Sequence, residues 1–401
     1  MKYILLVGDG MADYPIPELG EKTPLEVANI PNLNYLAQNG VVGEIKTVPD
    51  GMPPGSDVAI LSVLGYNPEK YYPGRAPIEA ASMGIELKED EIAFRCNLVT
   101  IEDEILKDYS AGHISTSEAK QIIEFLNEKL GSEQVKFYPG VSYRHLMVLK
   151  EDARWKMQNV RLTCTPPHDI TGKPYDSYLP TGEGAEVIRE LMFASQGFLE
   201  NHPVNQNRLK ENKNPANMVW LWGQGKPSKM PTLEQKFGLR GAVIAAVDLV
   251  RGLGKYAGLE IIDVPGATGY LDTNFIGKAE YALAALKNKD FVFVHVEAPD
   301  EAGHNGDLQA KIKAIEDFDS KVVGTIINGL PGIKDEVRIC ALCDHPTPIS
   351  LKTHSADNVP FILYGHKIEP DEILEYNEHS AKNTLINFQE GHTLINYFIM
   401  G

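Results

Sequence analysis

The apolar residues of this 401-residue chain form two patterns that alternate along the sequence. Short, almost continuous apolar runs are typical of strands in a parallel sheet that helices cover on both faces. Such runs occur at residues 3–8, 218–222, 291–296, 337–342 and 361–364. Between them, apolar residues spaced three and four apart predict helices, notably over 274–287 and 311–327. This alternation predicts a doubly wound α/β core with a mostly parallel sheet.

The middle third of the chain has a different pattern. Ser115 and Glu118 form a capping-box pattern, and the apolar residues after them predict a helix that closes at Gly131. The stretches 135–138 and 145–149 alternate between apolar and polar residues, which predicts short antiparallel strands.

The chain also contains a candidate domain boundary. The stretch 201–217 is polar, rich in asparagine and poor in large apolar residues, which is typical of a loop or linker. We therefore expect residues 87–215 to form an inserted second domain of α+β type. The core would then consist of residues 1–86 and 216–401.

Polar residues of metal-binding types cluster in four short segments, three of which follow a strand-like run. Sheets with helical crossovers assemble their sites at the carboxyl ends of the strands. Carboxylates mixed with imidazoles suit Mn²⁺, Zn²⁺ or Mg²⁺, and a metal pair can clamp the attacking and leaving oxygens of a phosphoryl group. The segments therefore predict a two-metal phosphoryl-transfer site built from Asp9, Ser56, Asp300, His304, Asp344, His345 and His354.

Two of these residues have a structural interpretation of equal weight. Asp9 precedes Gly10, which permits a tight turn beside a ligand, but an aspartate there could also cap a following helix. Ser56 precedes a predicted helix over residues 57–64 and could be its N-cap. The same helix start favours an anion, and metal coordination could activate the serine as a nucleophile.

The remaining candidates are defined by their spacing. Asp300 and His304 share one face if they lie on a helical turn, whereas the neighbouring glycines favour a loop that would still allow both to bind one ion. Asp344 and His345 can reach two neighbouring metals from a turn, and His354 follows nine residues later.

Composition narrows the class of partner. A net charge of −17 argues against nucleic acid or an anionic membrane, and no apolar run approaches the roughly 20 residues of a membrane span. The chain begins directly with a strand-like run and has four cysteines, so we expect a cytoplasmic protein without a disulfide framework. Cys340 and Cys343 lie three apart in a strand-like run, which favours buried structural thiols.

Taken together, the segments resemble the alkaline phosphatase superfamily, and more closely the archaeal-type branch of the cofactor-independent phosphoglycerate mutases. The resemblance covers nearly the whole chain. It is carried by GDGMAD, PPGSDVAILSVLGYNP, YYPGRAPIEAASMGI, AFRCNLVT, PDEAGHNGD, CDHP and THSADNVPFIL. It implies an alkaline-phosphatase-like α/β core with an inserted substrate-binding cap domain.

The resemblance also implies roles for individual residues. Ser56 matches the nucleophile, one metal would be bound by Asp300, His304 and His354, and the other by Asp9, Ser56, Asp344 and His345. The two divalent ions would be Mn²⁺, with Zn²⁺ or Mg²⁺ as alternatives, and no 2,3-bisphosphoglycerate would be needed. Arg240 matches the basic residue beside the metals.

On the substrate side, the resemblance implies Arg75, Arg95 and Asp108, the last as a base. The cap residues Arg144, His145, His168 and Asp169 are further candidates, for which surface or structural roles are equally open. The usual D-R-R-A-G-R-I segment of the branch reads Asp108-Tyr109-Ser110-Ala111-Gly112-His113-Ile114 here. Arginines are natural partners of carboxylate and phosphate, so this difference concerns the substrate.

The expected function is interconversion of 3-phosphoglycerate and 2-phosphoglycerate through a phosphoserine, a reaction of glycolysis and gluconeogenesis. The partner would be a small phosphorylated or hydroxylated acid, and a homo-oligomer is left open. One alternative is a homoserine kinase-like phosphotransferase of threonine biosynthesis, and a plain phosphatase is another. A non-catalytic metal-binding protein is the alternative of a different class.

Overall fold

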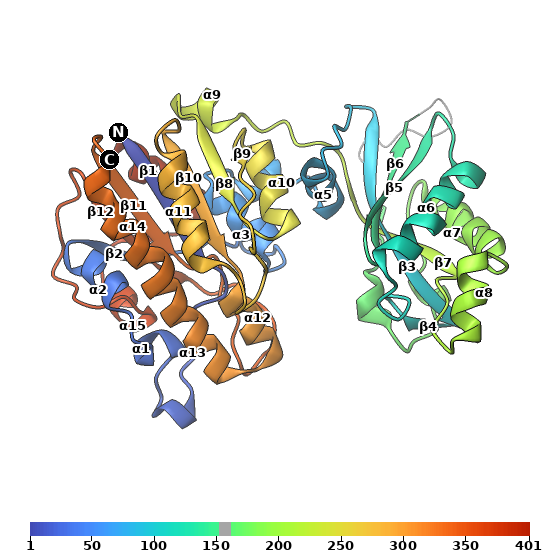
Figure 1. Cartoon of the computed structure of the whole chain (residues 1–401), viewed down its shortest axis with the longest axis horizontal. Helices are drawn as coiled ribbons and strands as arrows, with labels where there is room; N and C mark the ends of the chain where they lie inside the picture. The colour runs from blue at the N-terminus through green and yellow to red at the C-terminus, as the bar shows by residue number, and fades with distance from the viewer. Residues whose placement is uncertain (152–161) are drawn as a thin grey trace. The chain divides into compact units, whose positions relative to one another are not determined.

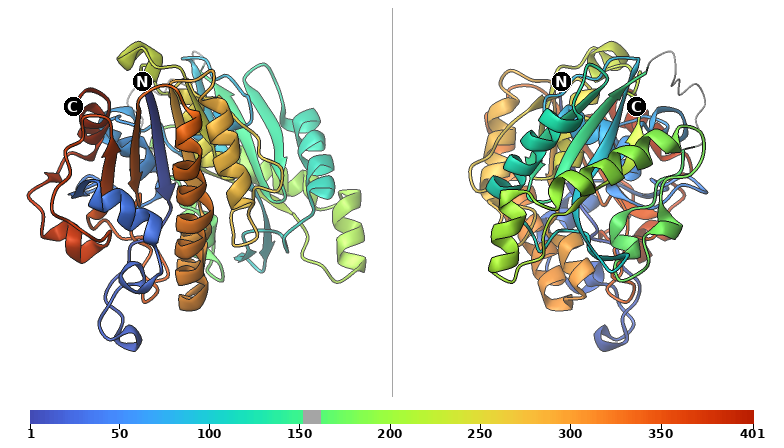
Figure 2. Two further views of the ribbon diagram at one scale, coloured as in Figure 1. Left: turned by 60° about the vertical axis from the view of Figure 1, so that its left-hand side comes forward. Right: turned by 90° about the vertical axis from the view of Figure 1, so that its right-hand side faces the viewer.

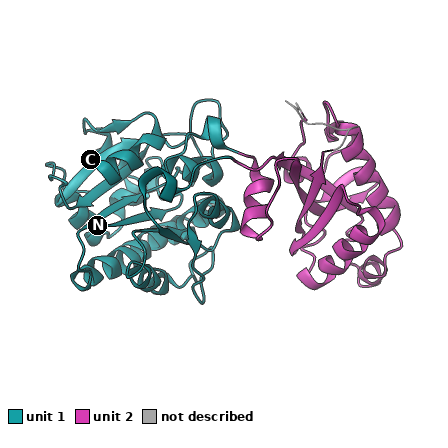
Figure 3. Cartoon of the chain, turned by 90° about the horizontal axis from the view of Figure 1, so that it is seen from above, with its two compact units in different colours: residues 1–72, 229–401 teal, residues 73–228 magenta. Residues whose placement is uncertain are grey.

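The chain folds into two compact units, each with its own sheet and core (Figure 3). The computed structural model describes residues 1–151 and 162–401. Unit 1 comprises Met1–Tyr72 and Lys229–Gly401, and unit 2 comprises Pro73–Ser228. The domain boundaries expected at 87 and 215 both fall inside unit 2. The difference arises because the helix at residues 75–82 and the strand at residues 218–225 both pack against the sheet of unit 2. We had expected both segments in the first domain.

Unit 1 is built on an eight-stranded sheet (Figure 1). In spatial order its strands are β13 (Asn387–Phe388), β2 (Gly40–Ile45), β12 (Val359–Gly365), β11 (Val337–Leu342), β1 (Lys2–Gly8), β10 (Phe291–Val296), β8 (Gly241–Ile244) and β9 (Glu260–Ile261). Among these strands, only β12 runs antiparallel to its neighbours. The expected α/β class with a mostly parallel sheet is therefore confirmed.

Helices lie on both faces of this sheet, as the views in Figures 1 and 2 show. The helices of unit 1 are α1 (Pro24–Val27), α2 (Pro31–Gln38), α3 (Ser56–Val63), α4 (Pro68–Tyr71), α9 (Leu233–Phe237), α10 (Asp248–Tyr256), α11 (Phe275–Ala285), α12 (Ala298–Asn305), α13 (Leu308–Asp317), α14 (Gly324–Gly329), α15 (Glu378–Lys382) and α16 (Leu394–Met400). The two helices predicted from apolar spacing are present. The second consists of α13 and α14 joined by a π-helical segment, Phe318–Val323. No helix in the described part of the chain is long and apolar enough to cross a bilayer.

The strand order determines which loops meet. The strands β11, β1 and β10 are parallel neighbours, so the segments after Gly8, Val296 and Leu342 leave the sheet at the same edge. Because β12 runs the opposite way, the loop that precedes it also lies at this edge. One reversed strand thus brings His354 to the segments that carry the other candidate ligands.

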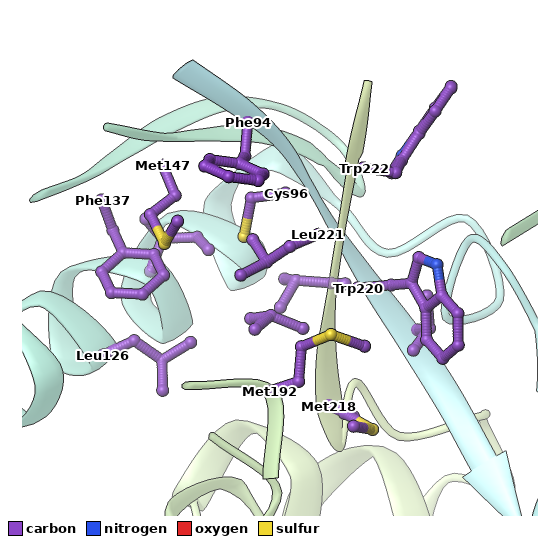
Figure 4. Close-up of a cluster of buried hydrophobic side chains, with 14 of the residues drawn as sticks. Phe94, Cys96, Leu126, Phe137, Met147, Met192, Met218, Trp220, Leu221 and Trp222 are labelled. Atoms are coloured by element: carbon purple, nitrogen blue, oxygen red, sulfur yellow. The ribbon is translucent and has the colours of Figure 1, made fainter. Parts of the chain in front are cut away.

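Unit 2 contains an antiparallel sheet covered by helices. Its strands are β3 (Glu91–Glu102), β4 (Ile105–Asp108), β5 (Val135–Val141), β6 (Arg144–Lys150) and β7 (Met218–Gly225). Its helices are α5 (Arg75–Ser82), α6 (Thr116–Leu130), α7 (Ala185–Leu199) and α8 (Pro203–Lys210). The core of the unit includes Phe94, Met147, Met192 and Trp220 (Figure 4). The predicted capping box begins α6, where Ser115 and Glu118 each bond the other's backbone.

Two expectations about this region were wrong. The run at 218–222 is not a strand of the parallel core: β7 pairs antiparallel with β3 in unit 2. An apolar run buried on both faces has the same pattern in either sheet. The polar stretch 201–217 contains α8, because Pro203 occupies its first turn and His202 caps it. Buried Asn205 then binds backbone carbonyls, which offsets its polarity.

A buried carboxylate supplies the cap that α2 lacks. Ile30 precedes the helix and cannot cap it with its side chain. Instead, the fully buried Asp319 of the π-helical segment accepts hydrogen bonds from the backbone N–H of Leu33, at 2.6 Å, and of Asn32.

We expect Asp319→Ala to lower the free energy of unfolding by about 1–3 kcal/mol, because it leaves buried N–H groups without an acceptor. Urea unfolding followed by circular dichroism measures this change. The matched control is Ser320→Ala, an exposed neighbour, which should have little effect. Equal stability of both variants would contradict the capping role.

Candidate active site

Ser56 is the first residue of α3, and its hydroxyl faces the edge of the sheet where the loops converge. Gly55, not Ser56, occupies the cap position, and the Ser56 side chain makes no capping hydrogen bond. Its Oγ lies 3.1 Å from Nε2 of His345. The half-buried serine is therefore available for chemistry at a helix start, where backbone N–H groups favour an anion.

Asp300, His304 and His354 form the first cluster of potential ligands. Asp300 and His304 lie one turn apart on α12, with 3.3 Å between a carboxylate oxygen and Nε2, so the helical interpretation of this segment is correct. Nε2 of His354 lies 3.4 Å from Asp300 and 2.9 Å from Nε2 of His304. The three side chains have ligand atoms close enough to share one ion.

Asp9, Asp344 and His345 form the second cluster, which contacts Ser56 through His345. Nε2 of His345 lies 3.5 Å from a carboxylate oxygen of each aspartate. Asp9 caps no described helix, and Gly10 after it has a φ of 64°, as the tight-turn interpretation requires. The backbone N–H of Gly10 donates to Oδ1 of Asp344, which links the loops after β1 and β11.

The orientation of the histidines suits metal binding. In His304, His345 and His354, Nε2 faces the cluster. Their Nδ1 atoms contact Lys352 O at 3.1 Å, Thr347 Oγ1 at 3.3 Å and Pro54 O at 3.4 Å. Such contacts on the remote ring nitrogen fix the orientation of metal-binding histidines in proteins.

The electrostatics of the site also favour cations. Burial, together with the carboxylates of Asp344 and Asp300, raises the pKa of Asp9. Burial alone would raise the pKa of Asp300, but hydrogen bonds from His304 and His354 lower it. The hydrogen bond to Asp300 raises the pKa of His304 to about 9. Buried carboxylates this close can all be ionised only beside positive charge.

Unsatisfied atoms show that the residues present fit divalent metals. Within the described residues, Oδ1 of Asp9 and Oδ2 of Asp344 are buried without any hydrogen-bond partner. Leaving a buried charged oxygen unpaired is costly. A cation bound by Asp9, Asp344 and His345 would satisfy both oxygens, and a second would be bound by Asp300, His304 and His354.

A buried lysine links two of the ligand-bearing loops. Lys311 of α13 is fully buried, and its ammonium donates to Ala12 O, to Thr347 O and, at 2.7 Å, to Oδ2 of Asp13. Thr347 in turn donates from Oγ1 to Asp300. Lys311 thereby connects the loop after Asp9 to the loop after His345.

Cys343 also connects the loop after Asp9 to the loop that carries His345. Its Sγ accepts from the backbone N–H of Ala12 and donates to the carbonyl of His345 at 2.8 Å. Cys340 and Cys343 are both buried and unpaired, and burial raises their thiol pKa values. The expectation that the C-x-x-C consists of buried thiols is therefore confirmed.

Unit 2 carries a separate cationic and aromatic cluster. Arg95 is buried, donates to Glu79 at 3.0 Å and stacks on Trp222, 4.2 Å from the ring centroid. The neighbouring guanidinium groups of Arg75 and Arg144 contribute to a lowered pKa of Arg95, whose main cause is burial. Positive charge gathered around aromatic rings is typical of a binding site for a small anion.

Residues 108–114, which replace the usual arginine-rich segment, begin at the end of β4 and lie close to this cluster. His168 packs edge-on against Trp222 and Tyr109, and Tyr109 and His113 each pack against Tyr143. Of the arginine-replacing residues, Tyr109 and His113 thus contribute aromatic surface. Ser110 instead donates to Asp108 at 2.7 Å.

Asp108 itself is committed to the turn. Its carboxylate accepts hydrogen bonds from the backbone of Ser110 and Gly112, from the Ser110 hydroxyl and from Asn214. Burial would raise its pKa, but these hydrogen bonds lower it, which makes the carboxylate a weak base. The geometry therefore favours a structural role over the base role implied by the resemblance.

Three other candidates lie outside the two carboxylate–histidine clusters and outside the cationic cluster of unit 2. Arg240 is exposed at the amino end of β8, where its backbone exchanges hydrogen bonds with Asp290; the metal-type ligands lie at the carboxyl edge of the same sheet. His145 is buried on the helix-covered side of β6 and accepts from Gly140 N–H through Nδ1. Asp169 is exposed, and its carboxylate lies 3.6 Å from Nε2 of His168.

Sequence reasoning missed several residues of the site. His295 lies inside the apolar strand β10, and its Nε2 is 3.1 Å from Oδ2 of Asp9. A histidine inside an otherwise apolar run was a usable signal. Lys311 and Thr347 had no such signal, because their role depends on tertiary contacts of distant loops.

The reversed β12 strand, the converging loops and the buried carboxylate–histidine clusters define a metal-dependent α/β enzyme. A family model described as 2,3-bisphosphoglycerate-independent phosphoglycerate mutase matches residues 37–205. A protein of that name from Methanosarcina acetivorans is 53% identical over 400 residues, which cover 100% of both chains. Another, from Methanothermobacter thermautotrophicus, is 50% identical and covers 98% of this chain and 96% of its own.

Solved structures agree with this result. A Pyrococcus horikoshii protein superposes with a TM-score of 0.83 at 30% identity, covering 99% of this chain and 96% of the other. The cofactor-independent phosphoglycerate mutase from Thermoplasma acidophilum superposes with a TM-score of 0.69 at 26% identity, covering 99% of each. The chain belongs to the family of 2,3-bisphosphoglycerate-independent phosphoglycerate mutases.

The Lys311–Asp13 pair should be essential for stability. Lys311→Met leaves the Asp13 carboxylate buried and unpaired, which we expect to cost about 3–5 kcal/mol in urea unfolding. Adding Asp13→Asn to this variant should restore part of the loss, because the buried charge is then removed. A double variant that is less stable than Lys311→Met would contradict the pairing.

Metal binding should displace a proton from His304. Its raised pKa of about 9 means that the ring is protonated near pH 7.5, whereas a ligand must be neutral. The proton stabilises the metal-free protein below the ordinary pKa of about 6.5, and this contribution disappears as pH rises through about 9. Cation affinity should therefore increase with pH up to about 9.

Calorimetric Mn²⁺ titrations in buffers of different ionisation enthalpy count the released protons. We expect His304→Gln to release about one proton fewer than the unmodified protein at the same pH. The same proton count in both would contradict protonation of His304 in the metal-free state.

Proposed function

We propose that this protein interconverts 3-phosphoglycerate and 2-phosphoglycerate without 2,3-bisphosphoglycerate. The observation that carries the proposal is the position of Ser56. Its hydroxyl lies at the start of α3, 3.1 Å from His345 and beside two carboxylate–histidine clusters. Membership of the mutase family supports the same substrate pair.

The proposed reaction has two matching halves. The Ser56 oxygen forms a bond to phosphorus while the bond to the substrate's hydroxyl oxygen breaks, which yields phosphoserine and glycerate. The other hydroxyl of glycerate then attacks, and the serine oxygen leaves. In the first half the proton of the Ser56 hydroxyl passes to the leaving oxygen of glycerate. In the second half the proton of the attacking glycerate hydroxyl passes to the serine oxygen, so no net proton is consumed.

The bound cations, for which we propose Mn²⁺, would supply Lewis-acid stabilisation of the serine alkoxide and of the phosphoryl oxygens. The protein's own residues prepare that chemistry. Ser56 Oγ lies 3.1 Å from Nε2 of His345, so both atoms can bind the same cation. The backbone N–H groups at the start of α3 favour negative charge. The loops that carry Asp9 and Asp344 are fixed by Lys311 and Cys343, which limits reorganisation during the reaction.

We propose that the cationic cluster of unit 2, taken by itself, is suited to bind the carboxylate of a small acid. Arg75, Arg95 and Arg144 provide positive charge, and Arg95 is held by Glu79 and Trp222. Tyr109 and His113 line the neighbouring aromatic surface in place of the usual arginines. The three retained arginines suffice, in this proposal, for an acid of this size.

The alternatives lack comparable support. The two relatives from Methanosarcina and Methanothermobacter are 53% and 50% identical to this chain over nearly its full length, and both are named as mutases. Neither name supports a homoserine kinase. All seven expected metal-site residues are present, and six of them converge in two clusters beside Ser56. This arrangement argues against a non-catalytic binding protein.

The test is an enolase-coupled assay of the Mn²⁺-loaded protein with 3-phosphoglycerate and no added bisphosphoglycerate. We expect turnover that chelation abolishes and Mn²⁺ restores. Ser56→Ala should reduce the rate by several orders of magnitude, because no covalent intermediate can form. Mass spectrometry of quenched reactions should find phosphate on Ser56.

The matched control is Ser62→Ala, a buried serine on the same helix that lies outside the clusters. It should retain turnover. Full activity of Ser56→Ala, or activity that survives complete metal removal, would contradict the mechanism. Phosphorylation of homoserine in the absence of mutase activity would contradict the substrate.

A further inference from the structure

His295 is a fully buried histidine whose ring is not satisfied by its surroundings. It is the polar residue of the strand Phe291–Val296, and its side chain has no exposed surface. Neither ring nitrogen has a hydrogen-bond partner within the described residues. Because an unpartnered buried polar group costs about 1–3 kcal/mol, retaining a histidine here needs a physical reason.

The ring lies against the second carboxylate–histidine cluster. Its Nε2 is 3.1 Å from Oδ2 of Asp9, yet the two atoms do not form an oriented hydrogen bond. The ligand atoms of Asp9, His295 and Asp344 all lie within 4.8 Å of one another. Ligands that surround one cation at bond lengths of about 2.0–2.2 Å lie at most about 4.4 Å apart, so a small adjustment of these side chains would bring all three around one ion.

The oxygens of Asp9 and Asp344 that lack hydrogen bonds favour one cation, not two, within this second cluster. Oδ1 of Asp344 already accepts from Gly10 N–H at 3.2 Å and from His345 N–H at 3.0 Å. Only its Oδ2 remains free, as does Oδ1 of Asp9. Both free oxygens lie 3.5 Å from Nε2 of His345. Because His295 has a ligand atom within 4.8 Å of one on each aspartate, one ion could contact all four residues.

We infer that His295 is a direct protein ligand of the second cation position, in addition to Asp9, Ser56, Asp344 and His345. This inference rests on the metal site of the proposed function. It gives that position five protein ligands and distinguishes it from the first position, which has Asp300, His304 and His354. The backbone supports the assignment, since buried Lys278 donates to the His295 carbonyl at 3.1 Å and anchors that part of β10.

The alternative is that His295 does not coordinate the ion and only contacts Asp9, which does. Loss of affinity alone cannot separate the two roles, because outer partners of ligands also affect affinity by about 10–100-fold. A measurement that counts the coordinated imidazoles does separate them. Cobalt(II) serves for this purpose, because each imidazole bound to it gives one hyperfine-shifted exchangeable N–H resonance.

The experiment is proton NMR of the Co²⁺-loaded full chain in water. We expect four shifted N–H resonances, from His295, His304, His345 and His354. Three resonances would overturn the inference and leave the other ligands intact. No shifted resonance under saturating Co²⁺ would instead contradict the metal site of the proposed function itself. Because the unmodified protein decides the count, folding of a variant is not required.

Variants then assign the resonance. His295→Gln should remove one signal and weaken Co²⁺ binding tenfold or more, measured by competition with a chelating dye. The matched control is His145→Gln, since His145 is equally buried, has an unpartnered Nε2 and lies in unit 2. It should leave all four resonances and the Co²⁺ affinity unchanged. Loss of a signal in the control, or none in His295→Gln, would contradict the assignment.

Discussion

Mutual repulsion among three buried carboxylates is the constraint on which the rest of the site depends. Asp9, Asp300 and Asp344 are at most 5% exposed and lie at the same edge of one sheet. Burial of such groups would normally protonate them or force the loops apart. Histidines lie beside all three carboxylates, and the buried Lys311 fixes the loops that carry two of them. The folded chain thus holds negative charge in the place where cations are to bind.

The topology of unit 1 explains how such distant segments reach this edge. Three parallel neighbours deliver the carboxylates, and the reversed strand β12 delivers His354. Chemistry-bearing residues after apolar runs were therefore predictable from the sequence, because strand ends meet in a parallel sheet. The i, i+4 spacing of Asp300 and His304 allowed a shared helical face, but the neighbouring glycines favoured a loop, and the helix α12 shows that the loop interpretation was wrong. The seven expected metal-site residues all lie at this edge or at the start of α3.

Other parts of the molecule could not be predicted, for physical reasons that differ. The run at 218–222 has the pattern of a core strand, but hydrophobicity does not specify which sheet a buried strand joins. Arg240 follows the expected motif, yet it lies at the wrong end of its strand, which depends on where β8 begins. Lys311 has the helical spacing of any surface lysine. Only the fold shows that three acceptors from two separate loops surround its ammonium.

The buried thiols have a consequence for how unfolding of this protein can be observed. Cys96 lies in the core of unit 2, whereas Cys340 and Cys343 lie in unit 1, and burial raises the pKa of all three. A thiol reagent needs the thiolate and access to sulfur. We therefore expect none of these three cysteines to react while its unit stays folded. Alkylation followed by peptide mapping can therefore time the opening of each unit separately within one chain, with no engineered label.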